Sequence, residues 1–284
     1  MINKLTMNMK KVLSMMLLAL TTVTLASAQS KTLLVSESGT PYAEETWYAY
    51  GDEGSIDQND IVACWNQGKR IISAAYTSEG WLVIMAKNTP YVMQTYSLTE
   101  AWPEEWLEAR TKEGYVVTAL SRSEKEWLVV MSQGTGITRQ AIWCNTWENL
   151  APWIAEQTNR GFCITGLAFD GLFWTVVMSE NSNYASQGYL WAKSTSELLS
   201  MVHTEVWGKG FNIHQVEFGA GKYIVVYGNY ERGDGRFQNL QVSPDEVKEY
   251  IREQWAKGIV ITYVGGGLPD ATKKDVPKRW VSKQ

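Results

Sequence analysis

Residues 114–140, GYVVTALSRSEKEWLVVMSQGTGITRQ, contain the pattern that decides the fold. A glycine opens the stretch, an aromatic residue follows thirteen positions later, and a glutamine follows after twenty-six. The glycine recurs at intervals of 46, 47, 49 and 48 residues, at Gly68, Gly114, Gly161, Gly210 and Gly258. The aromatic recurs at Trp81, Trp127, Trp174 and Tyr223, and the glutamine at Gln94, Gln140, Gln187 and Gln238. A fixed period of this length is typical of a repeat architecture.

Each repeat reads as three strands followed by a helix. Residues 116–120 are a short β-rich run, and residues 127–131 are continuously apolar, which predicts a strand buried on both faces. Residues 139–144 form a third strand after a glycine turn, and a helix then runs to Gly161. The sequence therefore predicts βββα units of about 47 residues, a mainly β fold with short helices.

The periodic glycine has a mechanical explanation. A glycine after the last turn of a helix adopts the left-handed conformation at little cost and redirects the chain. Helix starts are indicated by two capping-box patterns, Ser194 with Glu197 and Ser243 with Glu246. We therefore expect each glycine to end a helix and lead into the next strand.

The two ends of the chain are out of phase with the repeats. After Gly258 the last repeat supplies one strand, residues 260–264, and Ala271 stands where its aromatic belongs. Residues 33–35 match residues 82–84, so the N-terminal segment is expected to supply the missing second and third strands. Pairing of both ends in one composite unit predicts a closed, five-unit, propeller-like array without free sheet edges. The alternative is an open α/β solenoid.

The N-terminus has the features of a secretory signal peptide. Lysines 4, 10 and 11 precede the apolar residues 12–25, and Ala26-Ser27-Ala28 is a small-residue cleavage site. We expect residues 1–28 to be removed and the protein to be periplasmic or secreted. Residues 29–267 are then a single repeat domain, and residues 268–284 are a C-terminal tail.

Charge and composition exclude several partners. The whole chain carries a net charge of −4, and loss of the three signal-peptide lysines gives −4 − 3 = −7. An acidic protein is a poor partner for nucleic acid or an anionic membrane surface. No segment after residue 28 is long and apolar enough to predict a membrane span. Cys64, Cys144 and Cys163 occupy different places in their repeats, so neither a repeated disulfide nor a metal site is expected. No cofactor is expected either.

Several ordered elements resemble a known family. They are G-Y-x-[IV]-T-x-[AL], W-x-V-V-M-S and G-T-x-[YI]-x-x-Q, found at residues 114–120, 127–132 and 134–140, with further copies at 87–94 and 174–179. This pattern resembles a repeat domain of unknown function that follows the kinase domain in plant casein-kinase-I-like kinases and occurs in bacterial secreted proteins. The resemblance covers roughly residues 31–267 and implies a non-catalytic interaction module. The chain itself has no kinase motifs.

The repeated glutamines have two interpretations. Each stands at the start of a third strand, and Glu45 takes the fifth equivalent place. The side chains either tie the turn to a neighbouring backbone group or form a ring of amides at one mouth of the array. Four residues after each glycine stand side chains that are candidates to line the axis: Ile72, Thr118, Thr165, His214 and Thr262. Of these, only His214 is of a residue type that can titrate near neutral pH.

Catalytic signals are scarce. The sequence lacks the common metalloprotease and serine-hydrolase motifs. Glu217 is the single acidic residue of a first strand, so no glycosidase-type carboxylate pair is visible. Because Glu217 and His214 depart from the repeat, both are candidate ligand-binding residues. The insertion that breaks the period, residues 230–237, is a candidate binding site because insertions in repeat arrays often bind ligands. It contributes Tyr230, Arg232, Asp234 and Arg236 to the candidate residues.

The chain is rich in tryptophan, with fourteen in all. The periodic aromatics are expected in the core. Aromatics outside the period either pack against helices or stack on a ligand: Trp102, Trp143, Trp147, Trp191, Tyr91, Tyr184 and Tyr230. We therefore expect an exported, non-catalytic binding module for a protein, peptide or glycan. The alternatives are a carbohydrate-binding or glycan-cleaving propeller and a structural envelope protein.

Overall fold

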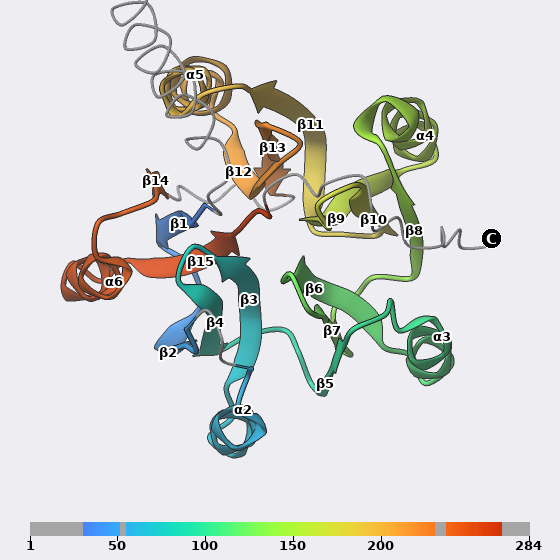
Figure 1. Ribbon diagram of the computed structural model, residues 1–284, viewed down its shortest axis with the longest axis vertical. Coiled ribbons are helices and arrows are strands. Elements are labelled where there is room, and N and C mark those ends of the chain that lie inside the picture. The colour runs from blue at the N-terminus through green and yellow to red at the C-terminus, as the bar shows by residue number, and fades with distance from the viewer. Residues whose placement is uncertain (1–30, 52–54, 231–236, 269–284) are drawn as a thin grey trace, which may run out of the picture.

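The structure, a computed structural model, describes residues 31–51, 55–230 and 237–268 (Figure 1). The predicted signal peptide, most of the predicted tail, and Arg232, Asp234 and Arg236 lie outside these described residues. The described chain is mainly β and forms five three-stranded antiparallel sheets. These sheets confirm the predicted β-rich repeat fold.

Each sheet has an outer, a middle and an inner strand, in that order. The first sheet comprises β2 (Ala43–Ala49), β4 (Gly80–Lys87) and β3 (Arg70–Thr77). The second sheet comprises β5 (Gln94–Thr99), β7 (Trp127–Ser132) and β6 (Val116–Arg122). The third comprises β8 (Arg139–Asn145), β10 (Trp174–Glu180) and β9 (Phe162–Phe169). The fourth is β11 (Tyr184–Ala192), β13 (Lys222–Tyr230), β12 (Asn212–Gly219). The fifth is β14 (Phe237–Val242), β1 (Leu33–Ser38), β15 (Val260–Gly265).

The sequence repeat is not the same segment of chain as the sheet. In the repeat that begins at Gly114, strands β6 and β7 pair with each other, but the third strand, β8, joins the next sheet beside β10. Its place beside β7 is taken by β5, the third strand of the preceding repeat. Every repeat therefore contributes to two neighbouring sheets, a strand exchange that the repeat pattern alone does not reveal.

The fifth sheet combines the two ends of the chain, as predicted. Strand β1 is its middle strand and pairs antiparallel with β14 on one side and with β15 on the other. The prediction that the N-terminal segment supplies two strands to this sheet is wrong, because β2 pairs with β4 in the next sheet. The cause is the strand exchange, which places every third strand in the following sheet.

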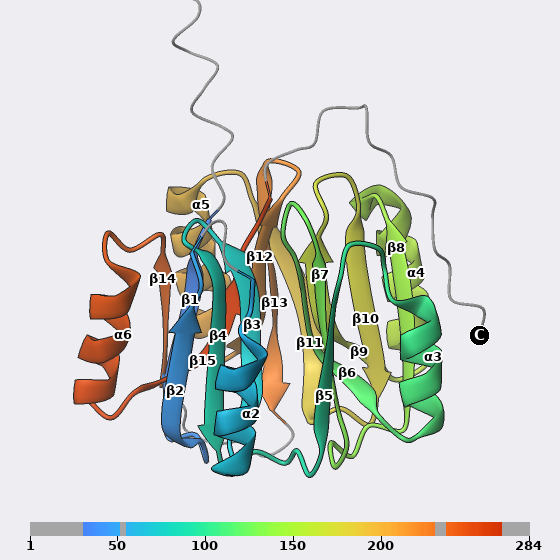
Figure 2. The ribbon, with the colours of Figure 1, turned by 60° about the horizontal axis from the view of Figure 1, so that its bottom comes forward.

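The five sheets surround a common centre, with the helices on the outside (Figure 1). In the turned view the strands run side by side around this centre, and the helices flank them (Figure 2). The inner strands contact one another in the succession β3, β6, β9, β12, β15, and β15 in turn contacts β3. The inner strands thus face the centre, which is where the candidate site lies.

The helices end at the periodic glycines. They are α2 (Gln58–Asn66), α3 (Glu104–Lys112), α4 (Trp147–Asn159), α5 (Thr195–Met201) and α6 (Val247–Ala256), with the short turns η1 (Val202–Val206) and η2 (Trp207–Lys209) after α5. The φ angles are all left-handed: 80° at Gly68, 85° at Gly114, 88° at Gly161, 76° at Gly210 and 71° at Gly258. The predicted helix stops are therefore confirmed.

The two predicted capping boxes have different outcomes. Ser194 caps α5, and its hydroxyl accepts a hydrogen bond from the Glu197 N–H at 3.1 Å. The box at Ser243 is wrong, because α6 begins at Val247 after Glu246, without a side-chain cap. Ser243 instead has a φ of 43° and donates its N–H to the Thr32 carbonyl at 2.6 Å. This hydrogen bond joins the segment before α6 to the segment before β1, near the other end of the chain.

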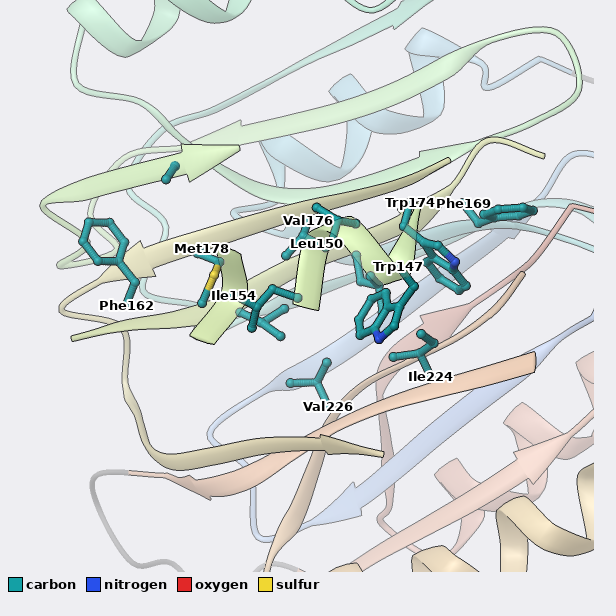
Figure 3. Close-up of a cluster of buried hydrophobic side chains, with 13 residues drawn as sticks. Trp147, Leu150, Ile154, Phe162, Phe169, Trp174, Val176, Met178, Ile224 and Val226 are labelled. Carbon is teal, nitrogen blue, oxygen red and sulfur yellow. The ribbon is translucent and has the colours of Figure 1, made fainter. Parts of the chain in front are cut away.

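The hydrophobic core lies between neighbouring sheets. Figure 3 shows one such cluster, in which Trp147 of α4 and Trp174 of β10 lie near Ile224 of the next sheet. The periodic aromatics are buried, which confirms that they are core residues: Trp81, Trp127, Trp174 and Tyr223. Burial of a large apolar side chain stabilises a fold by roughly 1.5–3 kcal/mol. In the fifth sheet the residue before the middle strand is the buried Thr32, which breaks the aromatic pattern.

Candidate functional site: a tyrosine-lined central pocket

Every inner strand carries a β-bulge near its start. In β6, Val117 pairs with Met131 and Ala119 with Val130, so the residue between them is left out of the register. The same shift occurs in β3, β9, β12 and β15. The five residues left out of the register are those that stand four positions after the periodic glycines: Ile72, Thr118, Thr165, His214 and Thr262. All five line a central cavity of about 120 Å³.

The repeated glutamines hold these bulges in place. Gln140 on β8 accepts a hydrogen bond from the Val117 N–H at 2.7 Å and donates one to the Val117 carbonyl at 2.8 Å. Gln94 makes the same pair with Ile71, Gln187 with Ile164, and Gln238 with Ile213. Each amide thus joins the third strand of its repeat to the first, across two sheets. These contacts match the turn-tie interpretation and occupy the amide groups with the backbone.

Glu45 takes the fifth place in this set. Its Oε2 accepts hydrogen bonds from the Ile261 N–H at 3.0 Å and from the Trp255 indole at 2.6 Å. Its buried Oε1 has no hydrogen-bond partner among the described residues. Burial raises the pKa of Glu45 from 4.5 to about 7, against the lowering effect of these two bonds. A protonated Oε1 would reproduce the donor that the glutamines supply.

A wider cavity opens onto the central one. It has a volume of about 770 Å³ and is lined by the turns between second and third strands. The two cavities share six lining residues: Tyr42, Tyr91, Thr118, Thr165, Tyr184 and Tyr230. Burial raises the pKa of Tyr91 well above its ordinary value, and the hydroxyls of Tyr42 and Tyr184 add to this rise. The four tyrosines therefore form a polar and aromatic rim at one mouth of the central cavity.

The rim tyrosines have a signal in the sequence, which is a fixed spacing from the repeated glutamines. Tyr42, Tyr91 and Tyr184 each stand three residues before Glu45, Gln94 and Gln187. Ile137 holds the corresponding place before Gln140 and also lines the wider cavity. Sequence reasoning named Tyr91, Tyr184 and Tyr230 as individual aromatics and missed Tyr42. The fixed offset from the glutamine would have found three of the four tyrosines.

His214 lies inside the central cavity between two rim tyrosines. Its ring stacks on Tyr184 with centroids 3.9 Å apart and planes 18° apart, and lies 5.0 Å from the Tyr230 ring. Its Nδ1 accepts a hydrogen bond from Gln187 Nε2 at 3.2 Å, since an amide nitrogen only donates. The predicted candidates His214 and Tyr230 are thus brought together, with Gln187 behind them.

Glu217 is absent from the described lining of both cavities. Its Oε1 accepts a hydrogen bond from the Tyr263 hydroxyl at 3.0 Å, and its Oε2 accepts one from the Gly266 N–H at 2.9 Å. Burial raises its pKa to about 8, although both bonds act in the opposite direction. Glu217 therefore holds the chain that leaves β15 rather than facing the pocket.

Two residues beside the candidates were not predicted from sequence. Glu37 of β1 is buried, lines the central cavity and accepts hydrogen bonds from the Tyr230 hydroxyl and from Gln238 Nε2. Gln215, next to His214, lines the same cavity and is 5% exposed. Its Oε1 accepts no hydrogen bond from the part of the chain that the structure describes. A buried polar atom of this kind is uncommon in a folded protein.

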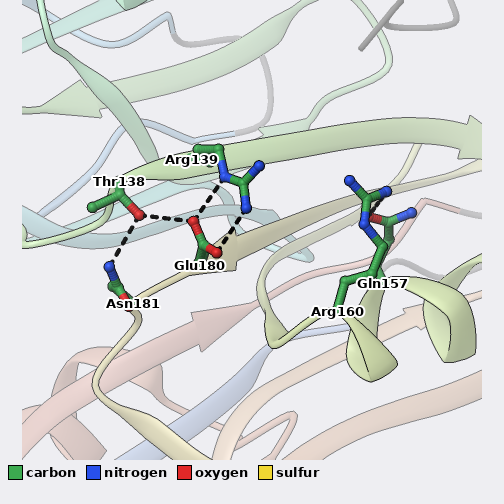
Figure 4. Close-up of polar contacts among 6 residues, drawn as sticks. All are labelled: Thr138, Arg139, Gln157, Arg160, Glu180 and Asn181. Atoms are coloured by element: carbon green, nitrogen blue, oxygen red, sulfur yellow. Dashed lines mark hydrogen bonds and ion pairs between the residues drawn. The ribbon is translucent and has the colours of Figure 1, made fainter.

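An exposed ion pair fixes two rim turns relative to each other (Figure 4). Arg139 Nε and Glu180 Oε2 lie 2.7 Å apart, and Arg139 also bonds Glu180 Oε1 at 2.8 Å. Thr138 bonds Glu180 at 3.0 Å and accepts a hydrogen bond from the Asn181 amide. The Arg139 hydrogen bond is the main cause that lowers the pKa of Glu180 to about 2. These contacts join the turn before β8 to the turn before Tyr184.

The other aromatics outside the period divide into two groups. Trp147 is buried, and Trp102 and Trp143 pack against core clusters. Trp191 is 46% exposed on the outer face, with the ammonium groups of Lys193 and Lys222 each 5.7 Å from its ring centroid. Trp191 thus lies outside the pocket, and ordinary packing accounts for the other three tryptophans.

A protein-family model matches part of the chain. The model of a family described as a domain of unknown function, DUF7477, matches residues 17–147, slightly less than half of the chain. No curated protein matches the chain. Over the described ranges, no helix has the length and apolar character needed to cross a membrane. The same ranges hold no group of three histidine, cysteine or acidic residues placed to bind a metal ion.

Proposed function

We propose that this protein is an exported, non-catalytic binding module that binds its ligand in the tyrosine-lined central pocket. The observation that carries the proposal is the convergence of Tyr42, Tyr91, Tyr184 and Tyr230 on one pair of connected cavities. A pocket of about 770 Å³ has the usual size of a small-molecule site. Aromatic side chains with a polar tip suit a binding surface because they offer both apolar area and a hydrogen-bonding group.

The proposal includes a closed, five-unit propeller as its scaffold. Support comes from the cyclic succession of inner-strand contacts and from the sheet shared by the two ends of the chain. A rigid ring would hold rim residues from different repeats in fixed positions, and sites on rigid elements bind with less loss of entropy. Kinship with the repeats that follow plant kinase domains is part of the same proposal, as is export to the periplasm or medium.

A binding role suits the pocket better than hydrolysis. Glu37 is the one carboxylate among the described residues that line the two cavities, and it is already bonded to Tyr230 and Gln238. Glycoside hydrolysis ordinarily uses two carboxylates on either side of the reacting bond. The Glu217 carboxyl, engaged with Tyr263 and Gly266, is not placed to be the second.

The test is a thermal-shift screen of the mature chain against a library of metabolites and glycans. Ligands that raise the Tm of the native protein should lose this effect in Tyr42→Leu and Tyr184→Leu. They should keep it in Trp191→Leu, because Trp191 lies on the outer face. Hits that stabilise the tyrosine variants as strongly as the native chain would overturn the assignment of the pocket. Turnover of any hit would overturn the non-catalytic role.

A further inference from the structure

The hydroxyl groups that line the central cavity are already hydrogen-bonded within the protein. They bond neighbouring side chains or backbone groups, and they belong to Ser73, Thr118, Thr165, Thr262 and Tyr263. A ligand that relies on many hydrogen bonds would find few free groups there. Recognition at the mouth of this cavity therefore falls to the aromatic rings of the rim and to the charges near them.

Glu37 is the one acidic side chain among the described residues that line the two cavities. It is 1% exposed, and its Oε1 accepts hydrogen bonds from the Tyr230 hydroxyl at 3.3 Å and from Gln238 Nε2. Neither cavity has a lysine or arginine among its described lining residues. The insertion at residues 231–236 carries two acidic and two basic residues, so it adds no net charge. The field at the rim thus favours a positively charged ligand.

His214 does not add a positive charge to the cavity. Two bonds with Ile164 orient the Gln187 amide, because its Oε1 accepts from the N–H at 2.6 Å and its Nε2 donates to the carbonyl at 2.9 Å. The same Nε2 lies 3.2 Å from His214 Nδ1, so Nδ1 must accept and carries no proton. An imidazole with one unprotonated nitrogen is neutral. His214 therefore acts as an uncharged ring that packs against Tyr184.

The rim tyrosines approach one space from different sheets. Tyr184 and Tyr230 have ring centroids 5.7 Å apart and planes 53° apart, so they form a corner and do not stack. Tyr42 and Tyr91 line the same two cavities from other turns. A cation within about 6 Å of the centroid of a tyrosine ring is attracted by the electron-rich face of that ring. Several rings around one space therefore suit a rounded cation.

We propose that the rim binds a quaternary ammonium group, which lies among the four tyrosines with Glu37 of the central cavity as its counter-charge. Such a group carries its charge on a surface of methyl groups and donates no hydrogen bond, so it does not need the occupied hydroxyls. The rest of the ligand extends into the wider cavity, whose turns carry the polar side chains of Asn88, Thr89 and Asn183. This inference rests on the proposed function and makes its ligand class more specific.

The test is isothermal titration of the full mature chain with three small probes. Choline carries the quaternary ammonium, 3,3-dimethylbutanol is its neutral isostere with carbon in place of nitrogen, and ethanolamine is a cation that donates hydrogen bonds. We expect choline to bind the native chain about tenfold more tightly than either of the others. Equal or tighter binding of 3,3-dimethylbutanol would overturn the ammonium inference, and this comparison needs no variant.

Substitutions at the rim test where the ammonium group lies. Tyr42→Leu and Tyr184→Leu should each weaken choline binding about tenfold, whereas Tyr42→Phe should retain it because the ring remains. Glu37→Gln, which keeps an acceptor for Tyr230, should reduce the preference for choline over 3,3-dimethylbutanol. Trp191→Leu is the matched control on the outer face and should bind choline as the native chain does. Full choline affinity in both leucine variants at the rim would overturn the site.

The remaining outcomes separate the inference from the proposed function. Binding of 3,3-dimethylbutanol alone, with loss in Tyr42→Leu, would overturn the ammonium inference and support the pocket as a binding site. Choline binding that only Trp191→Leu abolishes would overturn both. If none of the three probes binds, the ammonium inference fails, and the thermal-shift screen still decides the proposed function.

Discussion

At the scale of residues, the repeated glutamines show how one side chain supports a bulge. Each amide bonds both the N–H and the carbonyl of the residue before the bulge, in another sheet. Their position was predicted from the period, and a tie to a backbone group was one of the two interpretations of the pattern. The identity of the partner was not, because a sequence pattern does not show which strands exchange between sheets.

Gln140→Leu should lower the free energy of unfolding by roughly 1–3 kcal/mol, because it leaves both polar groups of the buried Val117 unpaired. Chemical denaturation of the native and variant chains measures the loss. Gln133→Leu is the control, since Gln133 makes one exposed bond, to the Glu113 carbonyl, and should cost less. Equal costs for the two variants would contradict the role given to the repeated amide.

Glu45 should make stability depend on pH. Its pKa is about 7 in the folded chain and near 4.5 when unfolded, so the folded state holds the proton more tightly. The stabilisation is complete below pH 4.5 and is lost as the pH rises through 7, by at most ~3 kcal/mol. Burial is the largest cause of the raised pKa, and the hydrogen bonds from Ile261 and Trp255 act against it.

The check is the slope of unfolding free energy between pH 5 and pH 8 in the native chain and in Glu45→Gln. The variant should be less sensitive to pH, and more stable at pH 8, because its amide can bond Ile261 as the other glutamines bond their partners. Both chains retain a slope from Glu217, whose pKa is raised in the same direction, so the difference between the two chains is the quantity to compare. Identical slopes would contradict this account of Glu45.

At the scale of elements, the helix stops were predictable and the helix starts only in part. A left-handed backbone conformation at the end of a helix favours glycine at that position, so the five helix ends could be predicted from the sequence alone. The start of α6 was not, because Ser243 bonds Thr32 from the other end of the chain. A local sequence pattern does not show a hydrogen-bond partner that lies far away in the sequence. The same limit hid Glu37 and Gln215, whose neighbours come from other repeats.

Gly114→Ala should cost about 1–2 kcal/mol of stability, because residue 114 has a φ of 85° and an added Cβ favours the opposite hand. The cost is purely conformational, since an added Cβ meets no atom within 4 Å. Gly114→Asn should cost less, because asparagine tolerates this conformation. Denaturation midpoints of the two variants provide the measurement. An alanine variant as stable as the asparagine variant would rule out the conformational explanation.

At the scale of the whole molecule, the two ends of the chain meet in one sheet. Leu33, Leu34 and Val35 of β1 are fully buried, and the strand has a ladder on each side. The offset between the sequence ends predicted this meeting. It did not predict that β1 alone enters the shared sheet, since that follows from the strand exchange.

Removal of residues 29–38 should abolish cooperative unfolding, because β14 and β15 would both lose their neighbour. Circular dichroism during heating shows whether a sharp transition remains. A synthetic peptide of residues 29–38, added to the shortened chain, should restore the transition, and the same peptide with Leu34→Asp should not. A sharp transition without any peptide would contradict closure through β1 and favour an open array.

The position of β1 also determines how the protein would respond to mechanical force. A middle strand with a ladder on each side does not peel away from a free edge. Tension applied along β1 from the amino end would load both ladders in shear at once, so many hydrogen bonds would have to break together. If the N-terminus were tethered to a surface, this strand would be a strong point of attachment. The sheet that joins the two ends of the chain would then also be its mechanical anchor.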